Sequence, residues 1–215
     1  MMSTEIMISP EELYFLGILM KAEYIDYAYI AAMDDIGQNY EVFESAVKDE
    51  LIKKGCISED FSGTVTVSPD MQALLKALFF GETEASLNVC TLGSVCTVDV
   101  IKYHFSGNTA VSVRNREGKL VIDYAAAEQI RSDVQGIIGE KKPDAADMIP
   151  VKPEDVTIKR VISAKKSSVE GRSTVVTYLD VDGILHSENS EKMLVPQDSA
   201  EVADGIFGLV KGDLK

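Results

Sequence analysis

The sequence has few of the residues on which catalytic centres are usually built. It contains two histidines, and its three cysteines include no Cys-X-X-Cys spacing. Without a cluster of histidines and cysteines, a zinc site is not expected. Phosphate-loop, dinucleotide-binding and serine-hydrolase motifs are also missing from the sequence. We therefore predict a protein that is not an enzyme and that uses no metal or other cofactor.

Positive charge is scarce as well. The chain has 21 Lys and Arg against 35 Asp and Glu, which gives a formal net charge of -14. Phosphate backbones and anionic lipid surfaces repel such a chain, whereas basic partners attract it. The simplest interpretation is that this charge keeps the protein in solution. We predict no nucleic-acid partner.

The sequence also lacks long hydrophobic runs. The longest, around residues 13–20 and 74–80, are too short to span a bilayer. The first ten residues lack the basic segment of a signal peptide. Cys90 and Cys96 could lie on neighbouring strands, but buried free thiols are the favoured interpretation. Together these features predict a cytoplasmic protein without membrane insertion.

The composition is that of an ordinary globular protein. Hydrophobic residues make up 46% of the 215 positions and charged residues 26%. Hydrophobic periodicity divides the chain into a helical segment at 1–82, strands plus a helix at 83–139, a proline-rich linker at 140–153 and a second strand-helix unit at 154–215. We expect these segments to form one compact domain overall.

The first segment has the order of a winged helix. Ser9-Pro10-Glu11-Glu12 is typical of a helix start, and further helices are expected at 24–33 and 41–54. A short β-ribbon at 57–67 follows, and then a helix that opens at Ser68-Pro69-Asp70. A helix, a hairpin and a helix in this order predict a winged-helix-like arrangement.

Two strand groups follow, and they are similar to each other. Each predicts a long strand, a second strand, a tight turn, a short strand and a helix, with turns at Glu117-Gly118 and Asp182-Gly183. The match is either an internal repeat around a pseudo-twofold axis or chance, because this order of elements is common. The predicted fold class is α+β: the winged-helix-like segment plus an antiparallel sheet from two quasi-repeated strand-strand-strand-helix units. His104 is expected to be half-buried in a strand, and His186 to be exposed after a hairpin.

Charge decides between two uses of the winged-helix-like segment. Residues 1–80 hold 5 Lys and Arg and 14 Asp and Glu, a net charge of 5 − 14 = −9. A DNA-binding surface needs the opposite balance. The sequence therefore favours a protein-binding platform over a winged-helix transcriptional regulator or a ligand-linked regulatory protein, which remain the alternatives.

Three stretches carry a resemblance to a known family: Leu-Ile-Lys-Lys-Gly-Cys-Ile-Ser-Glu-Asp at 51–60, Val-Ser-Pro-Asp-Met-Gln-Ala-Leu-Leu at 67–75, and Glu-Gly-Lys-Leu at 117–120. In their order along the chain they resemble the EspG family of cytosolic type VII secretion chaperones. The resemblance implies a quasi-twofold α+β fold and a non-enzymatic chaperone or adaptor for helical secretion substrates. Relative to actinobacterial members, this chain is richer in Lys, Ile and Tyr, which points to a Firmicutes-type secretion cluster.

The same resemblance implies where a partner binds. By analogy with the family, we expect an exposed apolar patch at strand edges and loops of the central sheet, within residues 103–113. The candidate partner-binding residues are Tyr103, Phe105, Val111 and Val113.

Overall fold

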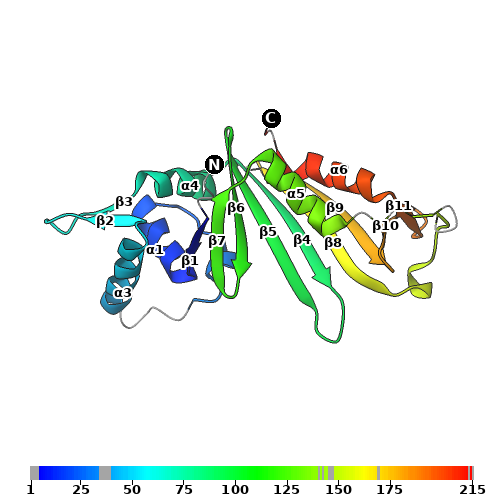
Figure 1. Cartoon of the computed structure of the whole chain (residues 1–215), viewed down its shortest axis with the longest axis horizontal. Coiled ribbons are helices and arrows are strands. Elements are labelled where there is room, and N and C mark those ends of the chain that lie inside the picture. Colours follow the sequence, from blue (N-terminus) through cyan, green and yellow to red (C-terminus); the bar gives the residue numbers. More distant parts are fainter. Residues whose placement is uncertain are drawn as a thin grey trace. The chain divides into compact units, whose positions relative to one another are not determined.

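The computed structural model describes residues 5–33, 40–139, 141, 143, 144, 148–168, 170–212 and 214. These residues form six α-helices and eleven strands, and nine of the strands belong to one antiparallel sheet (Figure 1). Contacts divide the chain into two compact units. The first unit comprises Met1–Glu82 and His104–Tyr124, and the second comprises Thr83–Tyr103 and Ala125–Lys215.

The first unit packs helices against one face of a short stretch of sheet. Strand β7 lies between β1 and β6, and Met7 of β1 is paired with Val121 of β7. The hydrophobic core includes Leu16, Leu51 and Leu75, all fully buried. Its elements are β1 (Ile6–Ile8), α1 (Pro10–Met20), α2 (Tyr27–Ile30), α3 (Tyr40–Lys53), β2 (Ile57–Glu59), β3 (Val65–Val67), α4 (Pro69–Phe80), β6 (Thr109–Arg116) and β7 (Lys119–Tyr124).

Several predicted features of the first unit are present. Helix α1 begins with a capping box, in which the Glu12 backbone amide donates to Ser9 Oγ and the Ser9 amide donates to Glu12 Oε2. The β2–β3 ribbon lies between α3 and α4, as expected. One expectation was wrong, because the helix expected at 24–33 is a single turn, Tyr27–Ile30. Strand β1 was not predicted, because three residues carry too little alternation.

The second unit is a sheet with two helices on one face. Figure 1 shows α5 and α6 lying side by side, and α6 contacts β4 and β8. Leu87 and Ile162 of the sheet are fully buried, and so are Val134 of α5 and Ile206 of α6. The elements are β4 (Thr83–Thr91), β5 (Thr97–Ser106, to Tyr103 in this unit), α5 (Ala127–Ile138), a 3₁₀ turn (Pro153–Asp155), β8 (Ile158–Ser168), β9 (Ser173–Val181), β10 (Ile184–Glu188), β11 (Leu194–Gln197) and α6 (Ser199–Val210).

Both predicted Xaa-Gly turns adopt the backbone that a two-residue hairpin needs. Glu117 and Gly118 have φ of 55° and 80°, and Asp182 and Gly183 have φ of 53° and 87°. Positive φ at both central positions matches the right-handed twist of the flanking strands. Each strand group places four strands before a helix, β4 to β7 before α5 and β8 to β11 before α6. That the two groups are repeats stays a prediction.

The structure describes only part of the predicted linker. Residues 140, 142 and 145–147 lie outside the described part of the chain. Within it, Val151 forms an antiparallel bridge with Leu194 of β11. None of the described helices is both long and apolar enough to cross a lipid bilayer.

Candidate functional site

The four residues expected to bind a partner are all buried. Val111 and Val113 are 0% and 2% exposed and belong to the core of the first unit, and Phe105 is 5% exposed. Tyr103 is 0% exposed, and its hydroxyl donates to Asp133 Oδ2 of α5 at 2.8 Å. The expected exposed patch is therefore not formed by these side chains, because period-two alternation identifies one face of a strand without showing which face is covered. That they contact a partner stays a prediction.

The two histidines do not gather with other reactive groups. His104 is buried, and its Nε2 lies 2.6 Å from the Tyr29 hydroxyl. His186 was expected to be exposed, and this was wrong: it is 5% exposed, and its Nδ1 donates to the Ile184 carbonyl. The reason is β11, which the sequence did not reveal and which makes β10 an inner strand. Within the described residues, no three His, Cys, Asp or Glu side chains come together as a metal site.

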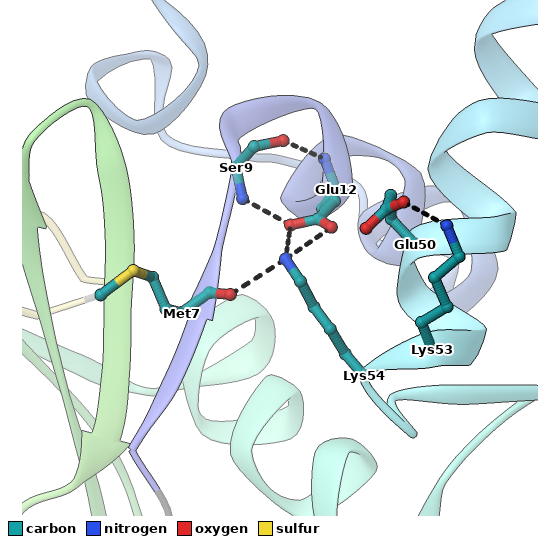
Figure 2. Close-up of polar contacts among 6 residues, drawn as sticks. All are labelled: Met7, Ser9, Glu12, Glu50, Lys53 and Lys54. Carbon is teal, nitrogen blue, oxygen red and sulfur yellow. Dashed lines mark hydrogen bonds and ion pairs between the residues drawn. The ribbon is translucent and has the colours of Figure 1, made fainter.

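One polar cluster of the first unit has a structural role. Figure 2 shows Lys54, the first residue after α3, donating to both carboxylate oxygens of Glu12 and to the Met7 carbonyl. The distances are 2.7 Å to Glu12 Oε1, 2.6 Å to Glu12 Oε2 and 3.1 Å to the Met7 oxygen. Glu12 also accepts the Ser9 amide. One lysine therefore joins β1, α1 and α3, and the nearly buried Glu12 carboxylate has its hydrogen-bond partners. Such a cluster fixes the packing of these elements and leaves little for a ligand.

A groove lies between α5 and α6. Its volume is about 510 Å³. The residues that line it show that the helices run in opposite directions, since Gly139 at the end of α5 lies near Ser199 at the start of α6. The lining contains no large apolar side chain and comprises Arg131, Gln135, Gly139, Ser199, Ala200, Ala203 and Asp204. We call this the α5–α6 groove.

Arg131 stands at one side of this groove and is held by two contacts from α6. Its Nη1 donates to Asp204 Oδ1 at 2.8 Å, and its guanidinium lies 4.0 Å from the centre of the Phe207 ring. A smaller hollow of about 200 Å³ is lined by Arg131 together with Phe207 and the first turns of α5. Arg131 therefore separates two neighbouring hollows on one helical surface.

The ends of the groove are fixed by the loops around it. Arg160 of β8 donates to the Ile137 carbonyl in the last turn of α5, and the same guanidinium pairs with the buried Asp180. Ser199 donates to the Lys141 carbonyl, which ties the segment after α5 to the start of α6. Asp198 caps α6 by accepting the Ala200 amide at 2.8 Å. The two helices are thus anchored to each other and to the sheet.

The groove was not predicted from the sequence, and both of its helices carry exposed glycines. Gly136, Gly205 and Gly208 lie inside α5 and α6, are exposed, and a Cβ added at any of them would meet nothing within 4 Å. Glycine inside a helix costs about 0.5–1 kcal/mol relative to alanine. Among the described residues, none lies close enough to these three positions to require a glycine there.

The fold of this chain is similar to one seen in a solved structure. One solved structure with this fold is that of EspG5 from Mycobacterium tuberculosis, described as a type VII secretion system chaperone in complex with the PE25-PPE41 dimer. The match has a TM-score of 0.64, covers 99% of this chain and 97% of EspG5, and has 10% sequence identity. No protein-family model and no curated protein matches the sequence.

Proposed function

We propose that this protein is a non-enzymatic chaperone or adaptor that binds a helical substrate of a type VII-like secretion system in the α5–α6 groove. The observation that supports this most is the groove itself, on a fold shared over nearly the whole length with the chaperone EspG5. A chaperone of this kind keeps a secretion substrate soluble before export by covering its apolar surface.

The shape of the groove suits a third helix better than a small metabolite. Two antiparallel helices leave between them a furrow into which the side chains of another helix can pack. The small side chains of Ala200 and Ala203 let such a helix approach closely, and the exposed glycines leave further open surface. Arg131 and Asp204 supply one charge of each sign for polar residues at the edge of the partner.

The proposed role also implies where the protein acts and what it does not bind. The protein would act in the cytoplasm, before its substrate is exported, and in a Firmicutes-type secretion cluster. It would bind no nucleic acid, because α3 carries four acidic residues and two lysines between Tyr40 and Lys53. Catalysis has no place in this role.

Co-expression with the small helical proteins encoded beside its gene tests the proposal. The tagged protein is compared with Ala200→Trp, which fills the groove from an exposed position, and with Ala46→Trp, the same change at an exposed position of α3. We expect a neighbouring protein to co-purify with the wild type and Ala46→Trp, and at least tenfold less with Ala200→Trp. The proposal is wrong if no neighbouring protein co-purifies, or if Ala200→Trp retains as much as Ala46→Trp.

A further inference from the structure

Two of the three cysteines meet at the tip of one hairpin. Cys90 is the last residue but one of β4, and Cys96 comes directly before β5. Their sulfur atoms lie 2.8 Å apart, and only five residues separate them along the chain. Both belong to the second unit, so one rigid body sets the distance between them.

The pair is open to solvent, unlike the third cysteine. Cys96 is exposed and Cys90 is partly exposed, and the tip between them carries the exposed Val95. Cys56 is only 3% exposed, and burial raises the pKa of its thiol. A small oxidant in solution can therefore reach the pair directly, whereas Cys56 is shielded by the core of the first unit.

We propose that Cys90 and Cys96 are a redox-active dithiol, which an oxidant such as hydrogen peroxide closes into an intramolecular disulfide across the tip of the β4–β5 hairpin. A disulfide needs its sulfurs about 2.05 Å apart, so the two atoms have to approach each other by about 0.8 Å. That movement is small for side chains on an exposed turn. In cytoplasmic proteins, disulfides of this kind are usually transient and redox-sensing.

The chemistry balances with one equivalent of peroxide. The Cys96 thiolate attacks one peroxide oxygen, the O–O bond breaks, and Cys96 becomes a sulfenic acid while hydroxide leaves and is protonated to water. The Cys90 sulfur then attacks the Cys96 sulfur, and the sulfenic hydroxyl leaves with the Cys90 proton as a second water. Two thiols lose two electrons and peroxide gains them. The hydrogen bond to Cys96 raises the pKa of Cys90, which suits Cys90 to hold the proton until the second step.

The disulfide would close a ring of seven residues that includes Leu92 and Val95, both of them exposed. Closing this ring removes backbone freedom from the hairpin tip. Oxidation therefore fixes an apolar turn in one conformation, and reduction by a thiol releases it.

Peptide mapping tests the proposal, because trypsin separates the pair from the third cysteine. Residues 77–102 form one tryptic peptide with Cys90 and Cys96, and residues 55–76 form another with Cys56. The reduced full-length protein is treated with hydrogen peroxide, denatured, alkylated with iodoacetamide, digested and weighed. We expect the 77–102 peptide to carry no alkyl group and to be two hydrogen atoms lighter than its reduced, unalkylated form. The 55–76 peptide should be alkylated on Cys56. Dithiothreitol before alkylation should restore both alkylation sites on 77–102.

Two cysteine variants test whether the disulfide is the one between Cys90 and Cys96. Cys56→Ser should form the disulfide as the wild type does, and Cys96→Ser should not form it. The rate of closure should not change with protein concentration, because both thiols belong to one chain. Free glutathione in the same tube serves as the control for oxidation. The proposal is overturned if glutathione is oxidised while both cysteines of the 77–102 peptide can still be alkylated. It is also overturned if the disulfide joins two chains.

Discussion

Arg131 of α5 and Asp204 of α6 form an ion pair beside the α5–α6 groove, with Nη1 2.8 Å from Oδ1. Their side chains are 46% and 70% exposed. An ion pair so open to water contributes less than about 1 kcal/mol to folding. Its importance lies in position, because it holds the Arg131 guanidinium over Phe207 between two hollows.

Arg131→Ala should weaken partner binding much more than it lowers the stability of the fold. We expect the free energy of unfolding to fall by less than about 1 kcal/mol. The affinity for the co-purified partner should fall about tenfold or more, because Arg131 lines the groove and arginine is enriched among the residues that carry most of the binding energy of an interface. Chemical denaturation and titration calorimetry measure the two effects. Arg172→Ala is the matched control, because Arg172 is 85% exposed and pairs only locally with Glu170. Equal affinities for the two variants would contradict the assignment of the groove.

Lys54→Met should destabilise the protein, whereas Lys53→Met should not. Removing Lys54 leaves the nearly buried Glu12 carboxylate without its cation, at a cost of about 2 to 4 kcal/mol. The cost is below that of a fully buried pair because the Lys54 side chain is 32% exposed. Lys53 pairs with Glu50 at the surface, where water screens the pair, so its loss should leave the denaturation midpoint nearly unchanged. Denaturant titrations that show the same midpoint for both variants would refute the structural role of the cluster in Figure 2.

Two Gly→Ala substitutions should shift stability in opposite directions. A Cβ at Gly81 would lie 2.5 Å from the Ala77 carbonyl oxygen and 2.8 Å from that of Phe105, so backbone would have to move. We expect Gly81→Ala to lower the free energy of unfolding by about 1–3 kcal/mol. Gly205→Ala places its Cβ in open space inside α6 and should raise it by about 0.5–1 kcal/mol. Thermal unfolding of both variants checks the signs, and a destabilised Gly205→Ala would show that α6 needs glycine for packing within the chain.

Asp60 should titrate below the ordinary range of aspartate. Hydrogen bonds from the Ser62 hydroxyl, and then from the Thr64 and Ser62 amides, lower the pKa of its carboxyl. A group whose pKa is lower in the folded state stabilises the fold above its unfolded pKa, and this contribution is lost as the pH falls through the folded value. The advantage of wild type over Asp60→Asn should therefore shrink from about pH 4 downward. A carbon NMR titration that places Asp60 at or above its ordinary value would exclude this turn geometry.

Much of the fold could be predicted because local signals are strong where the chain reverses or where a helix begins. Ser9 and Glu12 form the expected capping box, and Asp182-Gly183 forms the expected turn. The short strands β1 and β11 could not be predicted, because three or four residues carry too little alternation. Missing β11 led directly to the wrong exposure for His186, since an inner strand buries what an edge strand leaves open.

The candidate site was harder to predict than the fold for a physical reason. Arg131 and Asp204 are separated by 72 intervening positions, and only the packing of α5 against α6 brings them together. Besides this pair, the groove is lined by alanine, glycine, serine and one glutamine, residue types that carry no chemical signature. The strand residues chosen instead, such as Tyr103 and Val111, have a strong pattern because they are in the core.

Amide hydrogen exchange on the purified complex tests the central claim most directly. The protein is measured alone and bound to the helical partner that co-purifies with it. Binding in the α5–α6 groove predicts slower exchange in peptides from Ala127–Ile138 and Ser199–Val210, with the β2–β3 ribbon unchanged. Unchanged exchange in both helices, with protection confined to other segments, would contradict the account.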